Sequence, residues 1–366
     1  MIKKFIGAIV LGLYLLVLAV AITNGPLISF QSIVLGLVGL IVIIIGISSI
    51  AKTIHLVDIP DNIRKKHVGN VPLIGGVVLF FSIIYGSYVF GVDPFYRSII
   101  ISLTPIIIIG ILDGLKDFSI PVSFRLIAQI LASWIVILST NIYLRDLGDL
   151  MGLGIIFLGQ LGIPFTIFAV VGVCNAFNML DGKDGLTGSV SVVIISSLLL
   201  LLYLNGIIFS WGLILISSLL VFLAFNLNFF GQERKIFLGD HGSAGLGHII
   251  AWNLIYLSQE TDLITPVSAL WFIFLPLTDA LLTMVRRFRR ASTLHKPDRQ
   301  HLHHLLSDRG WSDKQVLLTF VIVSVISSFI AVLSNYWNLP EYNHFFGYIT
   351  VFIVLVILGT SKPENT

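Results

Sequence analysis

Apolar stretches of about 20 residues recur along the chain, separated by short polar segments. Such stretches predict membrane-spanning helices, because lipid offers no hydrogen-bond partner to backbone N–H and C=O groups. We place twelve spans near residues 5–22, 31–51, 72–90, 98–112, 122–142, 163–180, 188–204, 207–228, 243–257, 264–284, 316–334 and 345–361. The pattern therefore predicts an all-α fold, a polytopic membrane helical bundle of 11–12 transmembrane helices that forms one integral membrane domain over residues 1–366.

The first span, 5–22, fits two interpretations. Lys3 and Lys4 precede an apolar stretch that ends in Ala19-Val20-Ala21, which is also typical of a signal peptide with its cleavage site. Cleavage would leave eleven spans and an outer N-terminus, whereas an uncleaved anchor helix leaves twelve. We favour the anchor helix.

The composition excludes several classes of protein. Hydrophobic residues make up 56% of the chain and charged residues only 11%, with a mean hydropathy of +0.99, which excludes soluble globular and disordered proteins. The apolar runs lack the alternation of a porin-like barrel. The single cysteine, Cys174, excludes an internal disulfide and a cysteine-based metal site.

Positive charge is distributed unevenly between the two sides of the expected bundle. With odd-numbered spans running from inside to outside, only Arg97 and Arg145 of the 22 Lys and Arg residues fall on the outer side. The Lys/Arg rule then places both termini and the long loop 286–315 on the cytoplasmic face. We expect the outer segment 143–162 to be a solvated connector, with a small hairpin cap as the alternative.

Two inner segments combine charge with helix boundaries. Lys65, Lys66 and His67 precede an expected helix start, where a basic cluster either meets anionic lipid or binds phosphate groups. Asp113 lies where a long apolar run ends, and an acid at that position either closes the helix or serves a functional site. Arg125 lies in the next span, and we expect it to face the same cavity.

Polar side chains recur every three residues at Asn178, Asp181 and Asp184, at the inner end of an apolar span. If the helix continues through them they share one face, and their oxygens suit a hard cation such as Mg²⁺. Asp240, at the start of another span, either caps that helix or adds a further carboxylate to the same metal site.

Three histidines within four residues mark the last inner loop. His301, His303 and His304 include zinc-binding residue types, but no thiolate accompanies them and a regular helix does not point the last two the same way. An anion-binding role fits the neighbouring basic residues better. The arginines between 286 and 290 also fit a solvated loop that fixes topology.

Together these segments predict phosphoryl chemistry on one face of a membrane bundle. Carboxylate and amide oxygens suit Mg²⁺, with Mn²⁺ as the alternative, and Lys, Arg and His side chains suit oxyanions. Nucleotides are cytosolic, and an acceptor in the bilayer reaches the site laterally. The residues therefore predict transfer between a nucleotide-activated donor and a lipid phosphate, with no nucleic-acid partner.

The motifs resemble those of the polyprenyl-phosphate N-acetylhexosamine-1-phosphate transferases, most closely the WecA branch. The resemblance runs from about Leu56 to Trp311 and rests on RKKHVGNVPLIGG, ILDGLKD, NAFNMLDGKDGL, FLGDHGSAGLG and DRQHLHH. It implies a Mg²⁺-dependent transfer of GlcNAc-1-phosphate from UDP-GlcNAc to undecaprenyl phosphate in a bacterial inner membrane. The products, undecaprenyl-diphosphate-GlcNAc and UMP, would begin O-antigen or related cell-envelope polysaccharide synthesis.

The resemblance also implies roles for the matched residues. Asp113 would deprotonate or position the lipid phosphate, Asp181 and Asp184 are the matching acids of the third motif, and Asp240 would bind Mg²⁺ with them. Gly114 is a departure, because the family has a second Asp there; Asp117 lies one helical turn from Asp113. Substrate binding is expected of Lys65, Lys66, His67, Arg125, Asn178, His301, His303 and His304.

Three alternatives stay open at this point. A transferase of the same family could use another UDP-N-acetylsugar, of the fucosamine or quinovosamine type. A cation-coupled transporter would place its acids near the bilayer midplane, whereas these acids lie at the inner ends of the spans. A receptor or scaffold needs no such set of carboxylates. A homo-oligomer is compatible with the sequence.

Overall fold

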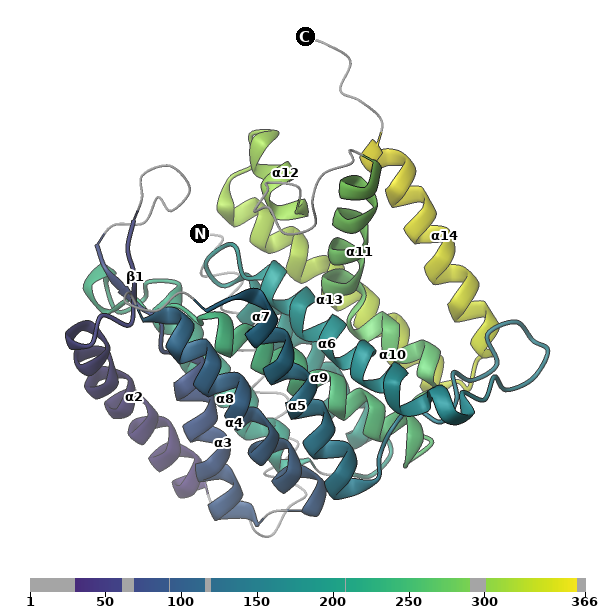
Figure 1. Ribbon diagram of the computed structural model, residues 1–366, viewed down its shortest axis with the longest axis horizontal. Coiled ribbons are helices and arrows are strands. Elements are labelled where there is room, and N and C mark those ends of the chain that lie inside the picture. Colours follow the sequence, from purple (N-terminus) through teal and green to yellow (C-terminus); the bar gives the residue numbers. More distant parts are fainter. Residues whose placement is uncertain are drawn as a thin grey trace.

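The structure is a computed structural model that describes residues 30–60, 69–91, 93–115, 120–207, 209–289 and 301–360 (Figure 1). Helices account for most of these residues, as the apolar pattern predicts. They are α2 (Phe30–Thr53), α3 (Gly75–Phe90), α4 (Pro94–Gly114), α5 (Val122–Thr140), α6 (Gly162–Leu180), α7 (Leu186–Leu204), α8 (Ser210–Asn226), α9 (Asp240–Gln259), α10 (Pro266–Phe272), α11 (Phe274–Arg289), α12 (Leu302–Asp308), α13 (Asp313–Tyr336) and α14 (Glu341–Thr360). Short 3-10 turns, η1 (Gly159–Leu161) and η2 (Gln232–Arg234), complete the helical elements.

Several of these helices match the dimensions of a bilayer. Among the described residues, six segments are long and apolar enough to cross a membrane: α2, α4, α5, α6 with η1, α7 and α13. The α10–α11 pair passes the same test together, and α3, α8 and α14 are shorter apolar helices. The protein is therefore a polytopic helical membrane protein. The expected anchor helix 5–22 lies outside the described residues.

The expectation of one continuous helix over 264–284 is wrong. α10 ends at Phe272 and α11 begins at Phe274, and the two helices are bent by 86°. Pro276 stands in the first turn of α11, where it has no N–H to donate to the Phe272 carbonyl and its ring would clash with that carbonyl in a continuous helix. The break redirects α11 and brings Asp279 to the histidine motif, which consists of His301, His303 and His304.

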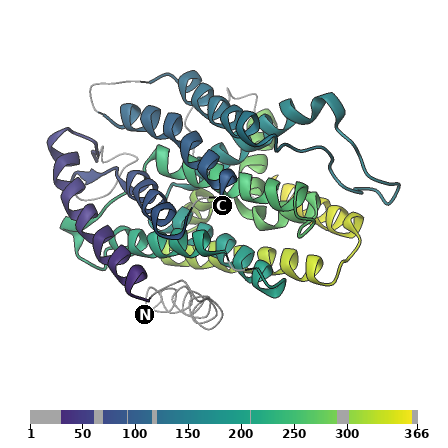
Figure 2. The same ribbon diagram turned by 90° about the horizontal axis from the view of Figure 1, so that it is seen from below.

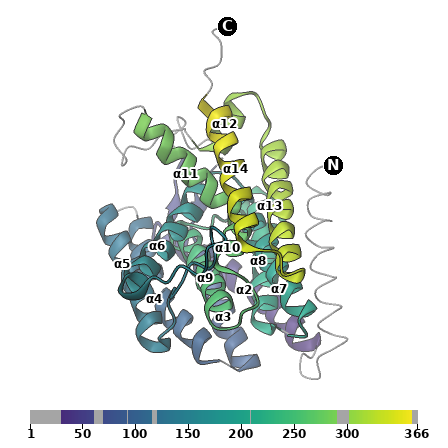
Figure 3. The ribbon, with the colours of Figure 1, turned by 90° about the vertical axis from the view of Figure 1, so that its right-hand side faces the viewer.

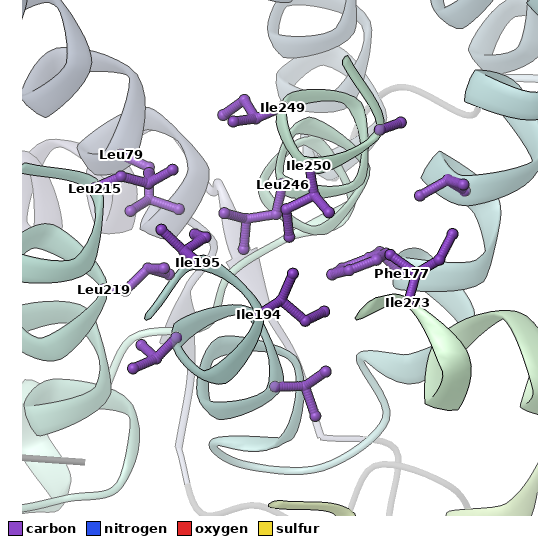
Figure 4. Packing of buried hydrophobic residues seen from close by; sticks show 14 of the residues in the cluster. Leu79, Phe177, Ile194, Ile195, Leu215, Leu219, Leu246, Ile249, Ile250 and Ile273 are labelled. Carbon is purple, nitrogen blue, oxygen red and sulfur yellow. The ribbon is translucent and has the colours of Figure 1, made fainter. Parts of the chain in front are cut away.

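The centre of the bundle is α9, which contacts α3, α4, α6, α7 and α10. It is buried along nearly its whole length. Figure 4 shows Leu246 and Ile250 of α9 directed toward Ile194 and Ile195 of α7, and all four side chains are at most 4% exposed. Close van der Waals packing of this kind holds membrane helices together, so the first turn of α9, with Asp240, stands on a firmly packed base.

The backbones of α6 and α9 come very close at Gly247. A Cβ atom on Gly247 would lie 2.8 Å from the Cα atom of Cys174 and 2.9 Å from the carbonyl oxygen of Val173. Small residues at such crossings let membrane helices approach closely. Cys174 itself is fully buried, so the contact is part of the core.

The variant Gly247→Ala is expected to lower the free energy of unfolding by about 1–3 kcal/mol, because the two backbones must separate to admit the methyl group. Thermal unfolding of the purified protein in detergent measures this. Gly172→Ala is the matched control on α6, since apart from the nearby backbone of its own helix no heavy atom lies within 4 Å of its Cβ position. An unchanged Tm for G247A would contradict the close crossing.

Two features mark opposite ends of the molecule. The strands β1 (Val57–Asp58) and β2 (Val71–Pro72) pair antiparallel, and β1 lies at the left of Figure 1, above α2. The loop between α5 and η1 lies at the lower right of Figure 1 and extends well beyond the helices in Figure 2. Asp146 and Phe157 pair antiparallel within it, so this loop is the hairpin alternative rather than the favoured connector.

Candidate active site

Polar side chains gather where four apolar helices begin or end. α4 ends at Gly114 and α6 at Leu180, while α5 begins at Val122 and α9 at Asp240. Asp113, Arg125, Asp181 and Asp240 therefore stand in or beside terminal turns, as the ends of the apolar runs predict. Figure 3 shows α12, which begins just after His301 and contains His303 and His304, at the upper end of the molecule together with α11.

A single guanidinium group joins two of these acids. Nη1 of Arg125 lies 2.6 Å from Oδ2 of Asp240 and 3.3 Å from Oδ2 of Asp113. The Asp113 and Arg125 side chains are 20% and 31% exposed, and Asp240 is 46% exposed. Arg125 therefore lies beside Asp113, and the ion pairs extend this group to Asp240; the cavity that they are expected to share stays a prediction.

Asp240 does not cap its helix. Gly239 occupies the N-cap position, with φ of 76°, and Asp240 is the first residue of α9. Its carboxylate is turned to Arg125 and remains partly open to solvent. The capping alternative is therefore wrong, and the carboxylate is available for ligands.

The polar residues Asn178, Asp181 and Asp184 do not all belong to α6. α6 stops at Leu180, and Asp181 adopts φ of −77° and ψ of 47°, so Asp184 lies on a separate turn. Gly185 closes that turn with φ of 75°, a left-handed conformation that favours glycine. The expected single face of Asn178, Asp181 and Asp184 is wrong.

The turn that carries Asp184 is tied to the segment before α9. Nζ of Lys235 lies 2.6 Å from Oδ2 of Asp184 and 5.1 Å from the centre of the Phe237 ring, and its side chain is only 7% exposed. Asn226 braces the same pair of segments, since its Oδ1 accepts from Gly185 N at 2.6 Å and its Nδ2 donates to Ile236 O at 2.9 Å. Sequence reasoning missed Lys235; its only signal is its place five residues before Asp240.

The histidine motif packs against the acids through one glycine. His303 is 1% exposed, and a Cβ atom on Gly182 would lie 2.2 Å from its Nε2. Only glycine lets the Asp181–Asp184 turn approach the ring this closely. Burial, together with His304, His301 and Lys183, lowers the pKa of His303 well below its usual range, so its imidazole is neutral at physiological pH.

The other two histidines surround His303. The rings of His301 and His303 are stacked with centres 5.8 Å apart, and those of His303 and His304 are 4.2 Å apart. His301 also lies next to Asp279 of α11, which is outside the motif; Nδ1 of His301 is 3.1 Å from Oδ2 of Asp279. The three histidines thus form one compact group beside the Asp181–Asp184 turn.

Of the remaining residues that the sequence singles out, some are described by the structure and others lie outside the described ranges. Asn178 is half-buried in the last turn of α6, and its carbonyl oxygen accepts from Asp181 N at 3.2 Å. Arg286 and Arg287 are in α11 and buried, so for these two the solvated loop is wrong. Outside the described residues lie Lys65, Lys66, His67 and Asp117.

The described residues include no three carboxylate, imidazole or thiol groups arranged as a ready-made metal site. Asp181, Asp184 and Asp240 are nevertheless within electrostatic reach of one another. Desolvation and the carboxylates of Asp240 and Asp184 raise the pKa of Asp181 to about 7. A divalent cation would relieve that repulsion, and Mg²⁺ typically binds one or two carboxylates plus phosphate oxygens. The acids therefore fit Mg²⁺ carried with a diphosphate.

Fold and site together define a class. Carboxylates lie beside an arginine, a lysine and a histidine group at the helix ends of a polytopic membrane bundle, an arrangement suited to anionic substrates that meet a lipid. Residues 96–258 match the model of glycosyl transferase family 4.

Curated relatives make the class more specific. The chain is 35% identical, over 81% of its length and 79% of theirs, to the undecaprenyl-phosphate alpha-N-acetylglucosaminyl 1-phosphate transferase of Escherichia coli O157:H7. The similarly named protein of Haemophilus influenzae is 36% identical over 89% of this chain and 92% of its own, and that of Yersinia pestis 33% identical over 78% and 79%. The chain belongs to the polyprenyl-phosphate N-acetylhexosamine-1-phosphate transferase family.

Proposed function

We propose that the protein transfers GlcNAc-1-phosphate from UDP-GlcNAc to undecaprenyl phosphate. The observation that supports this most is the Arg125 bridge between Asp113 and Asp240, beside the Asp181–Asp184 turn and the histidine motif. The names of the relatives mention undecaprenyl phosphate and an N-acetylglucosaminyl 1-phosphate group, and the resemblance of the motifs supplies UDP as the nucleotide of the donor. The partners are therefore a lipid phosphate, a nucleotide sugar and the surrounding bilayer.

The reaction is a displacement at the β-phosphorus of the donor. A phosphate oxygen of undecaprenyl phosphate forms a bond to that phosphorus, and the bond from the phosphorus to the bridging oxygen breaks. UMP leaves with the bridging oxygen and its electron pair. Asp113 positions the lipid phosphate, and the histidine motif (His301, His303 and His304) holds the donor diphosphate. A covalent route through Asp181 or Asp184 is the mechanistic alternative.

Mg²⁺ is the proposed cofactor, with Mn²⁺ as a substitute. Asp240, Asp181 and Asp184 would hold it together with diphosphate oxygens. When bound, the cation neutralises charge that builds on the phosphoryl groups during transfer. Lys235 keeps Asp184 oriented at 2.6 Å, so the acid turn needs little rearrangement to meet a ligand.

The proposed setting is a bacterial inner membrane with the site facing the cytoplasm. The Lys/Arg distribution supports this orientation, since 20 of the 22 basic residues fall on the side of the site loops when the twelve spans are counted. Cytosolic nucleotide sugars reach such a site directly. The lipid-linked product would begin an O-antigen or a related envelope polysaccharide.

The test is UMP release by the purified protein with undecaprenyl phosphate and Mg²⁺. UDP-GlcNAc, UDP-GalNAc and UDP-MurNAc-pentapeptide are compared, each with and without EDTA. Release with UDP-GlcNAc alone, abolished by EDTA, is expected. UMP release only with another UDP-N-acetylsugar would change the proposed donor to that sugar nucleotide. UMP release that persists in EDTA would overturn the proposed role of Mg²⁺.

Gly114 bears on the same proposal, because the family has a second Asp at this position. A Cβ atom on Gly114 would lie 2.8 Å from Cδ1 of Leu56 and 3.5 Å from Cδ1 of Leu73. The position thus faces apolar side chains near the β1–β2 pair. Restoring an acid there places its carboxylate against hydrocarbon.

Gly114→Asp is expected to leave kcat/KM no higher than in the wild type and to lower the free energy of unfolding by about 1–3 kcal/mol. Gly114→Ala is the control, since it adds the Cβ atom without the charge. Activity and thermal unfolding are measured on both. A rise of about tenfold in kcat/KM for G114D, roughly 1.4 kcal/mol of barrier, would mean that a second carboxylate is missing from this site.

A further inference from the structure

A buried acid outside the motifs holds the start of the histidine motif. Asp279 of α11 is 1% exposed. Its Oδ1 accepts from the backbone N–H of Leu302 at 2.7 Å, and its Oδ2 lies 3.1 Å from Nδ1 of His301. Oγ1 of Thr283 is 3.3 Å from the same ring nitrogen. One carboxylate therefore contacts both the first residue of α12 and the first histidine.

This contact fixes the chemistry of His301. A carboxylate only accepts hydrogen bonds, so Nδ1 of His301 carries a proton that it donates to Asp279. The other ring nitrogen, Nε2, is then directed away from Asp279, where it can meet a ligand. Partners of this kind determine both the tautomer and the orientation of a functional imidazole.

His301 is linked by ring contacts to the Asp181–Asp184 turn. The His301 ring stacks on His303 with only 5° between the planes. His303 in turn packs on Gly182, between Asp181 and Asp184. Contacts thus run from Asp279 through His301 and His303 to Gly182, in the turn that carries Asp181 and Asp184.

Aromatic rings pack beneath Asp279 where α10, α11 and α14 meet. Phe274 stacks on Trp271, with 5.4 Å between the ring centres, and both rings meet Tyr348 edge to face. The first turns of α11 are therefore locked to α10 and α14, and Asp279 projects from a fixed base.

We propose that Asp279 is a positioning residue for the nucleotide-sugar diphosphate: it holds His301 in one tautomer and, through His301 and His303, aligns the histidine motif over the acid turn. The proposal rests on the proposed function, and it adds a residue that none of the motifs contains. Asp279 acts through His301 and does not itself touch the substrate.

The variant Asp279→Asn separates positioning from simple support. Asparagine keeps an oxygen for the Leu302 N–H but turns an amide donor toward Nδ1 of His301, so the imidazole must change its tautomer. D279N is expected to raise the KM for the nucleotide sugar or lower kcat by about 10- to 100-fold in total, the usual effect of removing such a partner. The KM for undecaprenyl phosphate is expected to stay within about twofold.

Thr278→Val is the matched control, because it removes a buried hydrogen bond from the neighbouring residue of α11 without contacting a histidine. It is expected to retain both KM values. A double-variant cycle adds specificity: in a His301→Ala background, D279N should cost less than about threefold, since the two residues act as a unit. Full additivity of the two losses, or a wild-type donor KM and kcat in D279N, would overturn the proposal.

A spectroscopic readout keeps the test independent of turnover. Nuclear magnetic resonance of protein with isotope-labelled histidine reports the tautomer of His301, whose signal is assigned by its loss in His301→Gln. The signal is expected to change in D279N and not in T278V. If the wild type releases no UMP from any donor, the proposed function fails, and an unchanged His301 signal in D279N then separately overturns the positioning role.

Discussion

Asp240→Asn is expected to lower kcat/KM for UMP release by about 10³-fold or more, roughly 4 kcal/mol of transition-state stabilisation. The amide keeps the size of the side chain but loses the charge that pairs with Arg125 at 2.6 Å and that would bind Mg²⁺. The loss of the Arg125 ion pair and the loss of Mg²⁺ binding would both weaken stabilisation of the phosphoryl groups that react. The measurement is steady-state UMP release over a series of Mg²⁺ concentrations.

The matched control lies at the other end of the same helix. Glu260, just after α9, pairs with Arg145 at 2.8 Å, so Glu260→Gln also replaces a paired carboxylate by an amide. Activity within about twofold of the wild type is expected there, because exposed pairs contribute little. If D240N retained a tenth of the wild-type kcat/KM at saturating Mg²⁺, Asp240 would not be a metal ligand.

Arg125→Lys is the second large effect, with an expected loss of about 10²-fold in kcat/KM. Nη1 of Arg125 reaches both Asp113 and Asp240, whereas an ammonium group is a compact point charge without the planar fork of a guanidinium. The two acids would then repel each other and lose their common alignment. The measurement is kcat and KM for each substrate, with the KM for undecaprenyl phosphate rising more if Asp113 contacts the lipid phosphate.

Arg145→Lys provides the comparison for this substitution. Arg145 pairs with Glu260 on the hairpin side of the molecule, and its side chain is 45% exposed. No change beyond about twofold is expected from it. Equal losses in R125K and R145K would show that both act through stability, and thermal unfolding of the two variants decides this directly.

Helix boundaries made much of the site predictable. Long apolar runs locate the helices because the bilayer admits few other structures, and polar residues at their ends must then lie near water. This reasoning found Asp113, Arg125 and Asp240, which the structure joins in one ion-pair group. It also placed the histidines in the long inner loop 286–315, before the last two spans.

Contacts between distant segments were beyond the same reasoning. Lys235 is 51 positions from Asp184 and Asp279 is 22 from His301, and neither spacing follows from helical periodicity. The break at Ile273 was missed because hydrophobicity is continuous across it, although Pro276 gave a local signal. The end of α6 at Leu180 was missed for the opposite reason: a spacing of three looked helical where glycines had already ended the helix.

The burial of Cys174 has a practical consequence for mapping the protein in membranes. This thiol is the only one in the chain and is fully enclosed where α6 crosses α9. We therefore expect the folded wild-type protein not to react with maleimides. A cysteine introduced at Leu153, 89% exposed at the hairpin tip, or at Asp308 beside the histidine motif would be the sole reactive thiol, and an impermeant reagent applied to intact cells would tell which side of the bilayer each one occupies.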